Sequence, residues 1–158
     1  MSKKPYPKDV DPESGFRLPL PRREDLGDAA KKLYDGLSDP TGKSLVGLKG
    51  PGGIRLHSPR LAEVSSPVNR YLRWEAGFSG RVRELAILVT AREHDSRFEW
   101  VAHEDEAMRE GLPGEIVEVV KQRTSVAGLP ETDAVIIQLG RELFGARRVA
   151  PATFARAL

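Results

Sequence analysis

The chain of 158 residues contains no cysteine. Without thiols it can form no disulfide, no thiolate metal site and no dithiol redox couple. Aromatic residues make up only 6% of the chain, so we expect a core built mostly from Leu, Val, Ile and Ala. No apolar run approaches the roughly 20 residues of a membrane span, and no signal-peptide segment follows Met1. We therefore expect a cytoplasmic protein without membrane association.

The charges are nearly balanced, with 25 basic and 23 acidic residues interleaved along the chain. A nucleic-acid partner is not expected, because such proteins concentrate Lys and Arg on one face. The only local excess of positive charge is the short set Lys3, Lys4 and Lys8. The length suits one domain with a sizeable core.

Proline and glycine divide the chain. Residues 1–21 hold five of the twelve prolines and predict an extended N-terminal arm, followed by a single domain over residues 22–158. Residues 38–57 are rich in Gly and Pro, which predicts a long flexible loop. No segment has the pattern of a strand, so the predicted class is all-α. Helical periodicity predicts helices over about 23–37, 59–77 with a possible bend at Pro67, 80–93, 96–110, 113–122, 131–145 and from 151 onward.

Two of these helices carry the most informative residues. The segment LAILVTA at the centre of helix 80–93 is apolar on every side, which predicts burial on all faces and packing against helix 96–110. On helix 96–110 we expect Phe98, Val101, Met108 and the following Leu112 to face the core.

Glu99 and His103 lie four residues apart and share one face of helix 96–110 with Ser96 and Trp100. A carboxylate beside an imidazole can move a proton at neutral pH. A solvated Glu–His pair is the alternative, although the neighbouring Trp100 argues against plain solvent.

Glu84 lies on the preceding helix and can join this pair only if the two helices pack together. Its helical neighbours Ile87, Leu88 and Ala91 are apolar, so burial should raise the pKa of Glu84 and favour an acid–base role. An ion pair with Arg81, one turn earlier, is an equally open alternative.

His94 could add a further ligand to this group, but the spacing matches no compact metal motif, and we predict no metal site. His57, just before the helix start at Ser58-Pro59, could cap that helix or line a pocket. The glycines of LKGPGG match neither a P-loop nor a dinucleotide pattern.

Several stretches resemble the carboxymuconolactone decarboxylase family, whose helical fold is that of alkylhydroperoxidase D (AhpD). The resemblance is carried by LHSP at 56–59, RELAI at 83–87, FEWVAHEDEA at 98–107, the pair Gly111-Leu112 and RVAPATF at 148–154. The resemblance implies an AhpD-like all-α fold, a trimer or hexamer, and no cofactor. Relatives of this type continue into one more apolar helix, so we expect this domain to lack the family's last helix.

The peroxidase branch has a Glu, eleven residues, and then Cys-x2-Cys-x3-His. This spacing falls on Glu84, Ser96, Glu99 and His103, so both cysteines are replaced and a dithiol peroxidase cycle is excluded. The resemblance instead implies decarboxylation of a small carboxylated lactone from aromatic-acid catabolism.

In that reaction His103 would be the acid–base group, with Glu99 orienting it or acting itself and Glu84 in support. A cation should dock a substrate carboxylate, and Arg81, Arg92 and Arg97 are the options. The candidate substrate-binding residues are Ser96, Trp100, His57, His94 and Arg81. The alternative is a catalytically silent helical oligomer that serves as a binding or scaffold module.

Overall fold

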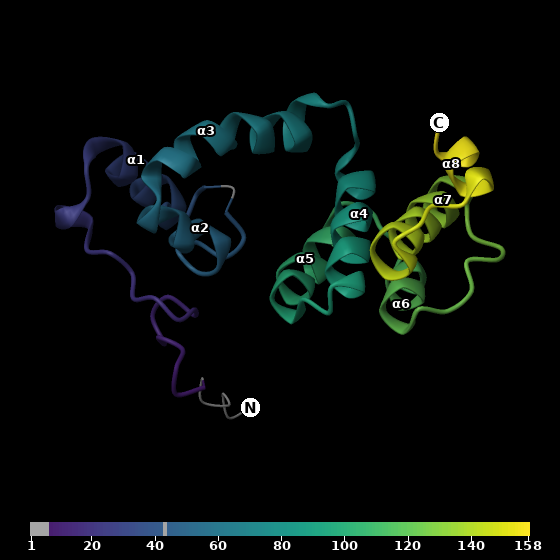
Figure 1. The fold of residues 1–158 in the computed structure, drawn as a ribbon, viewed down its shortest axis with the longest axis horizontal. Helices are drawn as coiled ribbons and strands as arrows, with labels where there is room; N and C mark the ends of the chain where they lie inside the picture. The colour runs from purple at the N-terminus through teal and green to yellow at the C-terminus, as the bar shows by residue number, and fades with distance from the viewer. Residues whose placement is uncertain (1–6, 43) are drawn as a thin grey trace. The chain divides into compact units, whose positions relative to one another are not determined.

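The structure is a computed structural model that describes residues 7–42 and 44–158, and it is all-α (Figure 1). No strand occurs in these residues, which confirms the predicted class. Across the same described ranges, no helix is long and apolar enough to cross a membrane. Residues 1–6 of the predicted arm, with Lys3 and Lys4, lie outside the described residues.

The chain divides into two compact units, with the boundary between Glu75 and Ala76. The first unit contains η1 (Arg23–Asp25), α1 (Asp28–Ser38), α2 (Pro51–Ile54), η2 (Arg55–His57), α3 (Pro59–Arg70) and the π-helical turn η3 (Tyr71–Glu75). The second contains α4 (Gly80–Glu93), α5 (Arg97–Arg109), α6 (Gly114–Gln122), α7 (Glu131–Gly140), the π-helical turn η4 (Arg141–Ala146) and α8 (Pro151–Ala157). The arm over residues 1–21 and the single domain over residues 22–158 that the sequence predicts divide the chain differently from these two units.

Residues 7–21 are not the extended arm that their prolines predicted. Asp11 Oδ1 accepts hydrogen bonds from the backbone N–H groups of Glu13 and Ser14, and Ser14 is fully buried. Farther along, the carbonyl of Pro19 lies 3.1 Å from Nε2 of His57. These contacts fold the segment back onto η2, so it belongs to the first unit.

The glycine-rich loop contains a short helix that sequence analysis missed. Pro51 occupies the first helical position of α2, where its missing N–H costs nothing. Gly50 precedes it with φ +61°, and Gly53 approaches the carbonyl of Leu48 so closely that a Cβ would lie 1.9 Å from it. The glycines therefore permit tight packing of the chain here, and residues 38–57 are not a loop along their whole length.

The start predicted at Ser58-Pro59 is confirmed for α3, which continues through Pro67 to Arg70. Its regular hydrogen-bonding then changes to the π-helical turn η3, which ends two residues before the predicted end at Gly77. Apolar side chains that are more than half exposed follow one another along α3 and η3: Leu61, Val64, Val68, Tyr71, Leu72 and Trp74.

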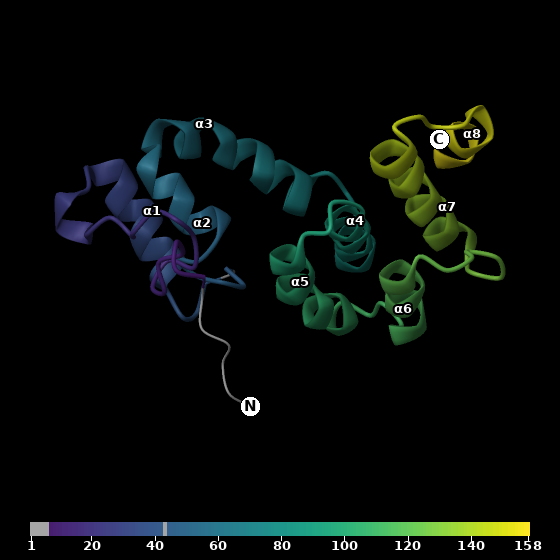
Figure 2. The ribbon, with the colours of Figure 1, turned by 60° about the horizontal axis from the view of Figure 1, so that its bottom comes forward.

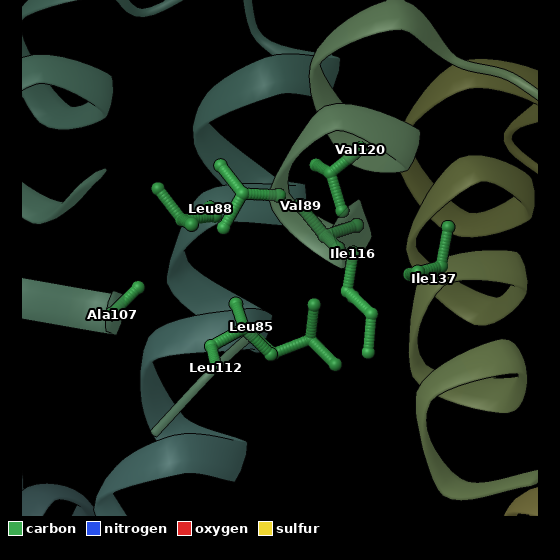
Figure 3. Close-up of a cluster of buried hydrophobic side chains, with 9 residues drawn as sticks. Leu85, Leu88, Val89, Ala107, Leu112, Ile116, Val120 and Ile137 are labelled. Carbon is green, nitrogen blue, oxygen red and sulfur yellow. The ribbon is translucent and has the colours of Figure 1, made fainter. Parts of the chain in front are cut away.

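The second unit is arranged around α4, which contacts α5, α6 and α7. Figure 3 shows side chains from all four helices and Leu112 meeting in one apolar cluster around Leu85 and Leu88 of α4. In Figures 1 and 2, α8 lies beside α7, which agrees with their contacts. The predicted bounds of α4 are confirmed: Ser79 caps it by accepting from Val82 N, 3.2 Å away.

Helix α7 crosses α4 at a glycine. A Cβ on Gly140 would lie 2.3 Å from Cγ1 of Val89, so only glycine allows this approach. The regular helix ends at Gly140, five residues before its predicted end at Gly145, and continues as η4. At the other end of the contact, Arg81 donates two hydrogen bonds of 2.6 and 2.7 Å to the fully buried carboxylate of Asp133.

Two predictions about burial were wrong. Helix α4 is not buried on all faces, because Ala86 is exposed and Ile87 only partly covered. Helix α5 turns the opposite face to the core from the one expected: Val101 is 71% exposed, and Phe98 and Met108 are also exposed. The stripe with His103 and Ala107 faces α4 instead, because a buried imidazole is tolerated when a partner satisfies its hydrogen bonds. Leu112 is buried, as predicted.

Candidate functional site

Glu84 of α4 and His103 of α5 meet between the two helices. Nδ1 of His103 lies 2.6 Å from Oε2 of Glu84, and only 2% of the Glu84 side chain and 6% of the His103 side chain are exposed. Ala107, one turn after His103, is fully buried against the same core. A methyl side chain at this position lets the helices approach closely enough for the pair to form.

Both oxygens of Glu84 have a hydrogen-bond donor. Oε2 faces His103, and Oε1 accepts a 3.1 Å hydrogen bond from Nε of Arg83. Burial acts to raise the pKa of Glu84, but the hydrogen bonds from His103 and Arg83 outweigh it and hold the pKa below the ordinary value of 4.5. The predicted raised pKa was therefore wrong: apolar neighbours desolvate Glu84, yet they do not decide its charge.

The ionised state of Glu84 determines which nitrogen of a neutral His103 imidazole carries the hydrogen. An ionised carboxylate can only accept hydrogen bonds, so the hydrogen between the two side chains belongs to Nδ1 of His103. The neutral imidazole then carries its lone pair on Nε2. This nitrogen is the one that can take up and return a proton.

Glu99 is the third member of the group. Its Oε2 lies 3.7 Å from Nε2 of His103, one helical turn away, and 37% of its side chain is exposed. This distance is too long for a hydrogen bond. Glu99 therefore lies beside Nε2 of His103 on the more exposed side of the group without forming a hydrogen bond to it.

The structure thus brings together Glu84, Glu99 and His103, which sequence analysis selected, and adds Arg83, which it missed. Neighbouring residues on a helix do not normally face each other, so no spacing rule pointed from Arg83 to Glu84. The open alternative for Glu84, an ion pair with Arg81, does not form, because Arg81 is paired with Asp133.

Ser96 is the N-cap residue of α5, and Trp100 lies on the first turn of this helix. The carbonyl of Ser96 accepts from Trp100 N, and its side chain caps no backbone group of the helix. Trp100 packs against the apolar cluster, and Nζ of Lys121 lies 5.9 Å from its ring centroid. Its Nε1 is buried and has no hydrogen-bond partner among the residues described. A role for either residue in substrate binding stays a prediction.

The other candidate substrate-binding residues have partners elsewhere. His94 follows α4 and packs against Phe144 with the two rings tilted by 56° and their centroids 4.9 Å apart. His57 belongs to the first unit and contacts Phe16 and Pro19 there. A substrate carboxylate would have to compete with Asp133 for Arg81. Substrate binding by these three residues stays a prediction without support from their contacts.

Residues 7–42 and 44–158 contain no group of three or more His, Asp or Glu side chains arranged to hold a metal ion. What the arrangement can do by itself is proton transfer. It holds a buried carboxylate on one nitrogen of an imidazole and leaves the other nitrogen beside a second, half-exposed carboxylate.

Comparison with known proteins gives one match. A family model described as the carboxymuconolactone decarboxylase family matches residues 59–139, just over half of the chain. The matched range contains α3 to α6, nearly all of α7 and every member of the Glu84, Glu99 and His103 group. Comparison with curated proteins found no match, and comparison with solved structures found none either.

Proposed function

Because the chain belongs to the carboxymuconolactone decarboxylase family, we propose that it is a cofactor-independent lyase that decarboxylates a small carboxylated lactone or a related acid in the cytoplasm. The observation that carries the proposal is the hydrogen bond between Nδ1 of His103 and the carboxylate of Glu84. It supports Nε2 of His103 as the atom that would exchange a proton with the substrate.

The reaction divides between the substrate and three side chains. The substrate's carboxylate leaves as CO2, and the electron pair of the broken C–C bond moves into the conjugated lactone carbonyl. Before this step, the free Nε2 of His103 takes up a proton from solvent. The protonated His103 then delivers that proton from Nε2 to carbon, which yields the decarboxylated lactone and a neutral imidazole. The buried negative charge of Glu84 stabilises the imidazolium before this transfer, and Glu99 lies where it can help to reprotonate Nε2.

A thiol peroxidase cycle is not an option, because Ser96 and Glu99 stand where that chemistry needs its two cysteines and the chain has none. The second candidate is a catalytically silent helical oligomer. It is favoured by one observation: His103 is almost fully buried, as expected of an imidazole that only stabilises the contact between two helices.

Self-association into a trimer or hexamer is part of the proposal. Its support is the exposed apolar surface of each unit: the row from Leu61 to Trp74 on α3 and η3, and Phe98, Val101 and Met108 on α5. Scattered apolar residues on a surface are normal, but contiguous rows along a helix mark association surfaces.

The decisive experiment measures CO2 release from 4-carboxymuconolactone and a panel of related carboxylated lactones. We expect turnover by the wild-type chain, a loss of about 100-fold or more in His103→Ala, and a smaller loss in Glu99→Gln. Asp105→Asn makes the same acid-to-amide change at an exposed position of α5 and should keep full activity. Absence of wild-type turnover on every lactone would favour the silent oligomer.

A further inference from the structure

A third carboxylate, that of Glu110, lies next to the first turn of α4. Glu110 directly follows α5, and a Cβ built on Gly80 would lie only 1.8 Å from its Oε2. Any side chain at position 80 would displace this carboxylate, so Gly80 provides the space that Glu110 occupies. The N-terminus of a helix also attracts negative charge, which favours the carboxylate in this place.

Arg83 connects Glu110 to the candidate site. Its Nη2 lies 3.3 Å from Oε1 of Glu110, while its Nε donates to Oε1 of Glu84 at 3.1 Å. Only 11% of the Arg83 side chain is exposed. A guanidinium is planar and rigid, so an anchor on one nitrogen fixes the direction of the others. Glu110 therefore determines where Arg83 presents Nε to Glu84.

We propose that Arg83 is a positioning residue. Glu110 occupies the space left by Gly80 and anchors Arg83. Arg83 in turn holds Glu84 in the orientation that keeps the hydrogen of neutral His103 on Nδ1. Arg83 donates to Glu84, and we propose that it affects His103 through this carboxylate. The inference rests on the proposed function for its catalytic meaning: a hydrogen held on Nδ1 leaves Nε2 free to take up the proton that it passes to the substrate.

The molecule contains a matched comparison for a purely structural ion pair. Arg81 lies on the same helix, and its pair with the buried Asp133 is at least as short. If Arg83 merely stabilises the fold, then removing either arginine should have the same kind of effect. If Arg83 positions Glu84, only its removal should change the protonation of His103.

The test is 15N NMR of the histidine side chains, which distinguishes the two neutral tautomers of His103 by their nitrogen shifts. We expect wild-type His103 to carry its hydrogen on Nδ1 and Arg83→Met to show a mixture of tautomers. Glu110→Gln should show a partial change, because Arg83 remains but is less firmly anchored. Arg81→Met should keep the wild-type tautomer, even where it lowers stability.

A second readout follows the carboxyl carbon of Glu84 by 13C NMR during an acid titration. The midpoint should move upward in Arg83→Met, upward by less in Glu110→Gln, and not at all in Arg81→Met, because only the first two weaken a donor to Glu84. If Arg83→Met does not fold, Arg83→Lys and Glu110→Gln still test the inference. Lysine keeps the charge but loses the rigid fork, so it should shift the tautomer population.

The inference is overturned if the tautomer and the Glu84 midpoint are the same in Arg83→Lys, Glu110→Gln and the wild type. Failure of the proposed function is a different result: the expected differences between the spectra of the variants and the wild type would still be seen, and only CO2 release would be absent.

Discussion

Nδ1 of His103 lies 2.6 Å from Oε2 of Glu84, which joins two residues 19 positions apart on neighbouring helices. The contact is buried, and the remaining oxygen of Glu84 accepts from Arg83. An imidazole in this arrangement has one nitrogen committed and one available. The following predictions test the contact, the packing that creates it and the surfaces around it.

Glu84→Gln should lower the free energy of unfolding by about 1–3 kcal/mol. The amide has one oxygen, whereas His103 and Arg83 both present donors to the carboxylate, so one buried donor loses its acceptor. Urea unfolding at neutral pH measures the change. Glu118→Gln, at a mostly exposed side chain, is the control and should change stability by no more than about 0.5 kcal/mol. Equal stabilities of Glu84→Gln and the control would contradict the prediction.

The stabilisation by Glu84 should disappear in acid. Its pKa is lower in the folded chain than the ordinary 4.5, so the unfolded chain takes up the proton first as the pH falls. The contribution is therefore fully present above about pH 5 and is lost as the pH falls through the folded-state pKa. Urea unfolding at a series of pH values should show a smaller acid dependence in Glu84→Gln than in the wild type. Parallel pH curves for the two proteins would show that the charge of Glu84 is not stabilised by folding.

Gly140→Ala should destabilise the second unit by about 1–3 kcal/mol, because the new methyl group overlaps Val89 and forces α7 away from α4. Thermal unfolding followed by circular dichroism measures the loss. Gly114→Ala is the matched control, since a Cβ there meets no atom within 4 Å and should be neutral or stabilise by up to about 1 kcal/mol. A Gly140→Ala protein as stable as the wild type would mean that the two helices are farther apart than described.

Val101→Asp should reduce self-association. Val101 is 71% exposed on α5, so the substitution should cost the single chain no more than about 0.5 kcal/mol. A charge in an apolar contact between copies is costly, and the mass in solution should fall. Size-exclusion chromatography with light scattering measures it, with Asp105→Asn on the same helix as the control. A monomeric wild-type chain, or an unchanged mass in Val101→Asp, would contradict the proposed oligomer.

The sequence by itself determined the helical class and most helix limits in the second unit, because these depend on neighbouring residues. Ser79 caps α4 by a hydrogen bond to a residue three positions away, and Gly111 follows α5 with a positive φ that glycine adopts readily. The four-residue spacing of Glu99 and His103 likewise placed them on one face of α5. The missing cysteines excluded thiol chemistry without any structure.

Only the tertiary structure decided which face of α5 turns inward and what charge the site carries. Val101 and His103 are two residues apart, and the apolar one lies outside because His103 finds Glu84 across the helix contact. The pKa of Glu84 falls for the same reason, since donors from two helices outweigh its burial. Local sequence shows how hydrophobic a position is, but the energy of a buried polar group depends on partners that only packing brings within hydrogen-bond distance.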